Sequence, residues 1–129
     1  MTEGRARLDA LPTIYPRVFS NGALPWGFEH GDGWCELIEA LCAHINTVLH
    51  DEPDTSMAVR QVKEKFGTLR FYYRLYGASD AMAKLIGAAV DRAEEASGQI
   101  CERCARSAKV QTNAGWWSTL CPRCRADST

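Results

Sequence analysis

The chain has 129 residues and a formal net charge of −1, with 46% hydrophobic and 24% charged residues. These values are ordinary for one folded soluble domain. No apolar run is long enough for a transmembrane helix, and no apolar core follows the N-terminus as it would in a secretory signal. We therefore expect a cytoplasmic chain whose six cysteines stay reduced.

The first 32 residues predict an irregular arm. They contain three of the five prolines together with Gly22, Gly27 and Gly31. Large apolar side chains such as Trp26 and Phe28 are scattered among them. Disordered linkers seldom carry so many aromatic residues, so we expect this arm to lie against the body of the protein.

A first helix is predicted from Asp32 or Gly33, with Asp32 as its N-cap, to about His50. Its apolar positions recur at helical spacing: Trp34, Leu37, Ile38, Leu41, Cys42, Ile45, Val48 and Leu49. The spacing of Cys35 and Cys42 places both thiols on one side of this helix, as buried free cysteines. Glu36 and Glu39 lie on the opposite side.

A β-hairpin is predicted next, with its turn at Gly67. Thr68 to Tyr76 alternates between Leu69, Phe71, Tyr73 and Leu75 on one face and Arg70, Tyr72, Arg74 and Tyr76 on the other. The stretch 57–63 alternates less regularly and is the weaker strand. Since a two-stranded ribbon is marginal alone, we expect the apolar face to pack on helices.

A second helix is predicted from Ser79 or Asp80 to about Ser97, followed by Gly98 as a stop signal. Its apolar stripe comprises Met82, Leu85, Ile86, Ala89, Val90 and Ala93. Beyond it, residues 109–112 and 116–120 are expected to pair as a small hairpin. Little helix is expected after Cys124.

Four cysteines form the strongest motif of the chain. Cys101 and Cys104 are one Cys-x-x-Cys pair, Cys121 and Cys124 are a second, and sixteen residues separate them. This spacing predicts one structural Zn²⁺ held by four thiolates, with no open position for catalysis. A redox dithiol or disulfide is the alternative. The surrounding arginines are weak evidence for nucleic acid, because four thiolates with one Zn²⁺ add two negative charges.

Two surfaces are candidate binding sites. Alternating cations and aromatic rings at Arg70, Tyr72, Arg74 and Tyr76 can meet phosphates and stack on bases, although such residues are also common on the solvent face of a strand. Trp116 and Trp117 should face opposite sides of their strand. One is expected to cover the zinc hairpin, and the other either packs on the body or is an exposed interface anchor.

No catalytic constellation is evident in the sequence. His30, His44 and His50 make no recognisable metal or catalytic set, and no phosphate-binding glycine loop or serine nucleophile motif occurs. The acidic helix face (Glu36 and Glu39, with Asp51 and Glu52) could complement the basic strand within the fold or in a dimer. We predict that the chain is not an enzyme.

Three stretches together resemble one family: Gly31-Asp32-Gly33-Trp34, the run from Val62 to Tyr72 (VKEKFGTLRFY), and the two cysteine pairs. The chain is similar, over residues 28 to 125, to small zinc-binding proteins of uncharacterised function from bacteriophages and prophages. The resemblance implies the cytoplasm of a bacterial host. Family members often have Cys-Gly after the first pair, where this chain has Cys104-Ala105.

The predicted architecture is therefore an α+β fold: two helices packed on a β-hairpin, with a C-terminal four-cysteine zinc ribbon or knuckle. Residues 1–98 form the body with its irregular arm, and residues 99–129 form the zinc module. The leading hypothesis is a non-enzymatic accessory protein that binds a host or phage protein, such as a component of host defence. The alternative is a nucleic-acid-binding protein that uses the basic aromatic strand and the arginines of the zinc module. Oligomeric state stays open.

Overall fold

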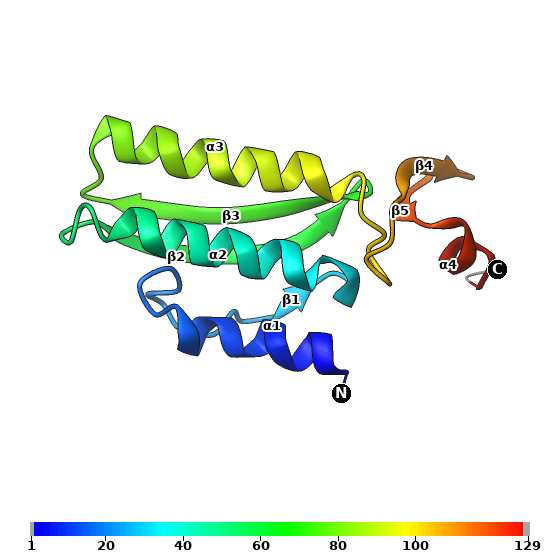
Figure 1. Cartoon of the computed structure of the whole chain (residues 1–129), viewed down its shortest axis with the longest axis horizontal. Coiled ribbons are helices and arrows are strands. Elements are labelled where there is room, and N and C mark those ends of the chain that lie inside the picture. The colour runs from blue at the N-terminus through cyan, green and yellow to red at the C-terminus, as the bar shows by residue number, and fades with distance from the viewer. Residues whose placement is uncertain (1, 128–129) are drawn as a thin grey trace.

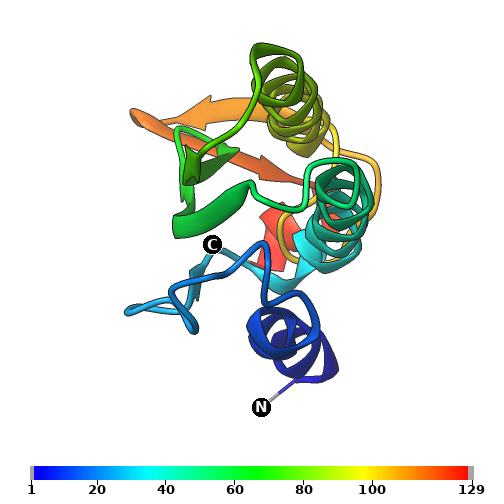
Figure 2. The ribbon, with the colours of Figure 1, turned by 90° about the vertical axis from the view of Figure 1, so that its left-hand side faces the viewer.

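Two helices cover one face of a β-hairpin, and a second, small hairpin follows at one end (Figures 1 and 2). The structure, a computed structural model, describes residues 2–127. The predicted body and zinc module also include residues 1, 128 and 129, which lie outside this range. The predicted fold class is confirmed. The main elements are α2 (Cys35–Leu49), β2 (Ser56–Lys65), β3 (Thr68–Tyr76) and α3 (Asp80–Ser97).

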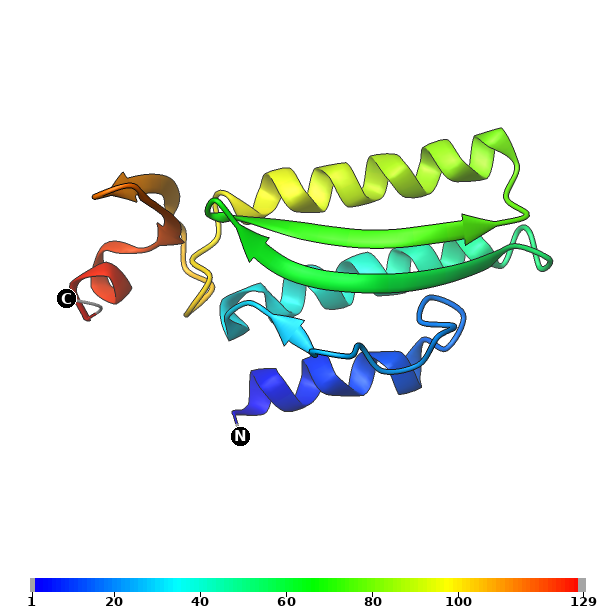
Figure 3. The same cartoon turned by 180° about the vertical axis from the view of Figure 1, so that it is seen from behind.

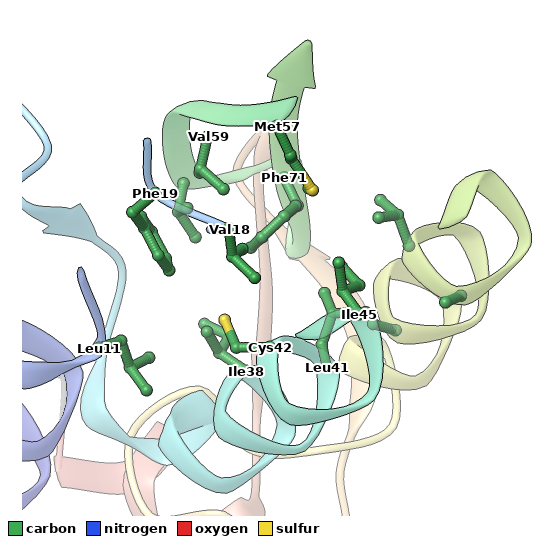
Figure 4. Packing of buried hydrophobic residues seen from close by; sticks show 14 of the residues in the cluster. Leu11, Val18, Phe19, Ile38, Leu41, Cys42, Ile45, Met57, Val59 and Phe71 are labelled. Atoms are coloured by element: carbon green, nitrogen blue, oxygen red, sulfur yellow. The ribbon is translucent and has the colours of Figure 1, made fainter. Parts of the chain in front are cut away.

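The hairpin follows the alternation of its sequence. On the inner face of β3, Leu69 and Phe71 are buried, while Tyr73 and Leu75 are half-buried against the helices. β2 is longer than predicted and contains a bulge between Val59 and Gln61. The core lies between this face and the helices, as Figure 4 shows for residues that include Val18, Ile38, Leu41, Ile45, Met57 and Phe71.

The second predicted helix is confirmed in its extent and its cap. The hydroxyl of Ser79 accepts a hydrogen bond from the backbone N–H of Met82 at 3.1 Å. Its buried positions include Ile86, Ala89 and Val90. Leu85, predicted to belong to the buried stripe, is instead exposed, because the helix contacts the body along a narrower face.

The start of the first predicted helix differs from the prediction. Residues Asp32–Trp34 form a 3₁₀ turn, η1, and α2 begins at Cys35, so Asp32 is not its N-cap. The carboxylate of Asp32 instead forms an ion pair with Arg5 at 3.1 Å and accepts a hydrogen bond from Thr2. Distant residues therefore use the side chain that was expected to cap the helix.

The prediction of an irregular N-terminal arm was only partly correct, because part of that arm forms a helix, α1 (Glu3–Ile14). The hydroxyl of Thr2 caps it, and Leu8 and Leu11 are buried against the rest of the molecule. Pro12 lies near the C-terminal end of α1, where a missing N–H removes only one intrahelical bond. A helix made mostly of small and polar residues, with a proline near its end, gave no clear periodic signal.

The remainder of the arm runs along β2. The backbone N–H of Val59 donates to the carbonyl of Val18 at 3.2 Å, and that of Ser20 donates to the carbonyl of Met57 at the same distance. β1 (Phe28–Glu29) then pairs in parallel with β2 at Val62 and Lys63. The sheet order is β1-β2-β3, which leaves β3 as an edge strand.

Side chains of α3 occupy part of that edge. The backbone N–H of Leu69 donates to the hydroxyl of Ser97, and the N–H of Phe71 donates to the carboxylate of Glu94, both at 2.8 Å. Ser97 is fully buried and donates in turn to the Glu94 carbonyl. The last turns of α3 are thus hydrogen-bonded to the first residues of β3.

The C-terminal segment, residues 99–127, is called the metal module. It contains the hairpin of β4 (Lys109–Asn113) and β5 (Trp116–Leu120), followed by a short helix, α4 (Pro122–Asp127), that was not predicted. Among the described residues no helix has the length and apolar character needed to cross a membrane.

Candidate metal centre and the surfaces around it

The four predicted ligands meet in the metal module. The first pair lies in the turn between Ile100 and Ser107, which form an isolated bridge. The second pair follows β5 and enters α4. The sulfur atoms all lie within 4.8 Å of one another, and the residues are Cys101, Cys104, Cys121 and Cys124. Three of the four are buried; Cys104 is exposed.

This arrangement fits one metal ion. Four sulfurs bound tetrahedrally at 2.3 Å from an ion lie about 3.8 Å from one another. Here the Sγ atoms of Cys104 and Cys121 are 3.5 Å apart, and the whole quartet stays within 4.8 Å. The quartet could therefore hold a metal ion without rearrangement of the backbone. A site filled by four protein sulfurs leaves no coordination position for a substrate.

Backbone N–H groups shape the acidity of these thiols. Burial raises the pKa of Cys101, but hydrogen bonds from the backbone around Cys121, Cys104 and Arg103 outweigh it and lower that pKa to about 6. The N–H of Cys124, 3.4 Å from the sulfur of Cys121, is the main cause that lowers the pKa of Cys121. Burial and the neighbouring thiols raise the pKa of Cys124 to about 12, so only two members of the quartet favour the thiolate form that binds cations.

The Gly-Asp-Gly-Trp sequence forms the first contact between body and metal module. The N–H of Gly33 donates to the carbonyl of Glu102 at 2.7 Å, and the N–H of Gly31 donates to its carboxylate at 2.8 Å. The indole of Trp34, fully buried, donates to the carbonyl of Ile100 at 2.9 Å. A Cβ at Gly33 would overlap the backbone of Cys101 and Glu102, so only glycine permits this approach.

The turn of the β2–β3 hairpin forms the second contact. The hydroxyl of Thr119, a buried residue of β5, donates to the carbonyl of Gly67 at 2.5 Å. The side chain of Val110 lies 3.1 Å from the position that a Cβ would take at Gly67. Gly67 also has φ +88°, which other residues rarely adopt. The Gly-Asp-Gly-Trp stretch and the turn within VKEKFGTLRFY are two of the three stretches that carry the family resemblance. Both therefore fix the metal module to the body.

Three exposed aromatic side chains meet where the module contacts the hairpin turn. Phe66 is 60% exposed, Trp116 80% and Trp117 48%. Together with Glu64, Lys65 and Gly115 they line a hollow of about 380 Å³, which we call the aromatic cleft. Both tryptophans of β5 line this cleft.

Phe66 was missed by the sequence analysis, although its position carried a signal. A two-residue loop between strands normally uses Asn-Gly or Asp-Gly, because both residues need positive φ. Here the loop is Phe66-Gly67, with φ +55° at the phenylalanine. A bulky residue at a position suited to asparagine indicates a role outside the turn.

The second candidate surface lies on the outer face of the hairpin. Arg70 is half-buried, while Tyr72, Arg74 and Tyr76 are exposed. Figure 3 shows β2 and β3 from this side, with no helix in front of them. The structure thus places all four predicted residues on one open face, which we call the basic sheet face.

Within the fold, Glu39 and Glu52 do not complement that face. Glu39 pairs with Arg7 of α1, and the carboxylate of Glu52 accepts hydrogen bonds from Thr55 and from the backbone and hydroxyl of Ser79. These acids connect helices and loops on the opposite side of the protein.

Within residues 2–127, the cysteine quartet is the only group of three or more His, Cys, Asp or Glu side chains placed to share an ion.

Comparison of the chain with models of known families, with curated proteins and with solved structures found no match. Function therefore has to be inferred from the residues themselves.

Proposed function

We propose that this chain is a non-enzymatic zinc-binding protein that acts by binding another protein through the aromatic cleft. Four thiolates select a soft or borderline ion, and Zn²⁺ is the usual resident of a closed four-cysteine site. In this role the zinc is structural: it fixes the β4–β5 hairpin, and with it two of the three cleft aromatics.

Phe66 is the observation that carries the proposal. A non-glycine residue at φ +55° costs about 1–2 kcal/mol, and Asn would occupy this position with less strain. The ring recovers little of that cost within the fold, since it is mostly exposed and contacts the cation of Lys65, whose Nζ lies 5.5 Å from the ring centroid. A strained, exposed aromatic residue is the kind of feature that function retains.

Exposure of the neighbouring tryptophans supports a protein as the occupant. Trp and other aromatic residues supply most of the binding energy at protein interfaces, usually from a small central cluster. Trp116 and Trp117 approach Phe66 from a different hairpin, so the cluster joins two parts of the chain. An apolar group of this kind is otherwise a solubility cost to a monomer.

The resemblance to phage and prophage proteins bears on the identity of the partner. It favours a protein of the bacterial host or of the phage, met in the host cytoplasm, and components of antiviral defence are one such class. The partner is defined here by its chemistry: an apolar side chain or segment that enters the aromatic cleft.

Affinity capture from infected and uninfected host lysates, with and without nuclease, tests the proposal. The baits are the zinc-loaded chain, Phe66→Asn and Trp116→Ser, with Leu85→Ser as a control that removes an equally exposed apolar side chain from α3. We expect a nuclease-resistant partner that wild type and Leu85→Ser retain and both cleft variants lose.

The stability of Phe66→Asn separates function from folding. We expect this variant to unfold at higher denaturant concentration than wild type, with a gain of about 1 kcal/mol, while it loses the partner. A partner that binds Phe66→Asn and Trp116→Ser as tightly as wild type would refute the cleft as the binding site. Partner binding that disappears with nuclease would refute a direct protein contact.

A further inference from the structure

We infer that the basic sheet face binds single-stranded nucleic acid. This surface shares no residue with the aromatic cleft, so the inference does not depend on the protein partner proposed above. It rests on cations that the fold leaves unpaired, on their arrangement across two strands, and on exposed tyrosines between them.

Two cations of this face are direct cross-strand neighbours. Lys63 and Arg70 are directly opposite in the β2–β3 register, so they occupy the same side of the sheet. Like charges at such positions destabilise a hairpin. Arg74 lies further along β3, and Arg60 is exposed at the bulge of β2. The register places one carboxylate, Glu29 of β1, beside Lys63, where it accepts a hydrogen bond from Gln61.

Three arginines elsewhere in the body have partners within the chain. Arg5 pairs with Asp32, Arg7 pairs with Glu39, and Arg17 donates to backbone carbonyls that include those of Leu49 and Thr55. By contrast, four cations lie on the basic sheet face or beside it on β2: Arg60, Lys63, Arg70 and Arg74. Within residues 2–127, no ion pair or side-chain hydrogen bond involves them. These cations are therefore free to contact an external anion.

The tyrosines specify the kind of polyanion. Tyr72, 43% exposed, lies between Arg70 and Arg74 along β3, and Tyr76 follows at the same spacing. Rings and cations thus alternate every second residue, about 7 Å apart. Phosphates can contact the cations while unstacked bases lie on the rings, a combination that duplex DNA, with its bases stacked inside, does not offer.

The metal module contributes little to this surface. Arg103 donates to the carbonyl of Cys124, and Arg125 donates to the hydroxyl of Ser118 and the carbonyl of Leu120. Two of its arginines thus hold the module together. The nucleic-acid site is assigned to the sheet alone.

The test is fluorescence polarisation with the full zinc-loaded chain and labelled oligouridylate or oligothymidylate of about 12 nucleotides. With four phosphate contacts, the logarithm of the affinity should fall with the logarithm of salt concentration at a slope of about −3, or about fiftyfold between roughly 50 and 200 mM. The double variant Arg70→Ala/Arg74→Ala should halve that slope.

Tyr72→Ala distinguishes stacking from charge alone. We expect it to weaken binding about tenfold without changing the salt slope, because the ring carries no charge. Lys84→Ala, which removes an exposed cation from α3, and Trp116→Ser, which alters the aromatic cleft, should both bind as wild type. Zinc content and thermal unfolding confirm that each variant is folded.

Four outcomes would overturn the inference: no binding at low salt; equal binding by the double arginine variant; equal binding of a duplex of the same length; or displacement by polyglutamate at equal charge together with wild-type affinity in Tyr72→Ala. The last result would define an unspecific anion surface. None of these outcomes concerns the aromatic cleft, so the protein-binding proposal stands or falls separately.

Discussion

The body and the metal module are held together by different forces. In the body the interior is made of large apolar side chains, among them Trp34, Phe19, Ile45 and Leu69. In the metal module the buried residues are three cysteines and Thr119. The body is therefore stabilised by the removal of apolar surface from water, and the module has little of this stabilisation beyond an ion that its four thiolates could hold. The junction between them depends on backbone contacts that only glycine permits.

Metal removal should give the largest difference between the two regions. We expect a chelator to unfold residues 99–127 while α1, α2, α3 and the β2–β3 hairpin persist, because structural zinc contributes about 10–16 kcal/mol of binding free energy to such modules. Amide hydrogen exchange followed by residue-resolved NMR measures both regions at once. Cys121→Ser should reproduce the result without a chelator.

A core substitution should give the converse result. Ile45→Ala removes a fully buried side chain and should lower the free energy of unfolding of the body by about 2–5 kcal/mol, with zinc affinity preserved. Complete unfolding of the body on chelation, or loss of zinc from Ile45→Ala, would show that the two regions fold as one unit.

Gly33→Ala breaks the junction itself. The added methyl group overlaps the backbone of Cys101 and Glu102, so we expect the free energy of unfolding to fall by about 1–3 kcal/mol. The backbone N–H of the substituted residue and the Trp34 indole N–H should exchange faster than in wild type. Gly87→Ala is the matched control, since a Cβ there meets only the hydroxyl of Tyr73 at 3.7 Å and the helix gains propensity. Equal stabilities of the two variants would refute the close approach.

A pH titration probes the body close to the junction. Burial lowers the pKa of His30, whose Nδ1 lies 2.8 Å from the carbonyl oxygen of Gly31 and whose Nε2 has no hydrogen-bond partner among residues 2–127. Below its ordinary pKa of about 6.5 the unfolded state therefore binds more protons than the folded state. Stability is complete above that pH and falls as the solution is acidified.

Urea unfolding of the zinc-loaded chain between about pH 7.5 and 5.5 measures this dependence, with zinc retention followed in the same samples. His30→Phe should flatten the slope, because a phenyl ring can occupy the place between Phe28 and Trp34. His44→Gln, at an exposed position, should leave it unchanged. Identical slopes in His30→Phe and wild type would assign the acid sensitivity to other groups.

The smallest effect is expected within the module. Ala105 follows the first cysteine pair and has φ +72°, a conformation that favours glycine. Ala105→Gly should therefore stabilise the zinc-loaded module by about 0.5–1 kcal/mol, seen as a higher chelator concentration needed for half removal of the metal. Ala108→Gly, where φ is not positive, should have the opposite sign.

Elements encoded by local pattern could be predicted from the sequence. The alternation of Leu69 to Tyr76 identified β3, the stripe from Met82 to Ala93 identified α3, and the cysteine spacing identified the metal ligands. Features that depend on distant contacts could not be predicted. α1 has weak periodicity and contains Pro12, and Asp32 is used by Arg5 rather than by its own helix.

The candidate surfaces divide in the same way. The basic sheet face follows from alternation in one strand, so its four β3 residues were identified from the sequence. The aromatic cleft requires two turns from separate hairpins to meet, and nothing in the local sequence around Phe66 indicates that Trp116 and Trp117 will lie beside it. The feature of the sequence that could have indicated the cleft is the unusual Phe-Gly loop.

The contacts of Ser97 and Glu94 with β3 have a consequence for behaviour at high concentration. An exposed strand edge is a template on which other chains can add, and growth of this kind leads to cross-β fibres. Here the donors of Leu69 and Phe71 are already occupied by α3. An incoming strand therefore finds no free amide at this end of the edge from which to begin pairing. The final turns of α3 thus protect the protein against polymerisation.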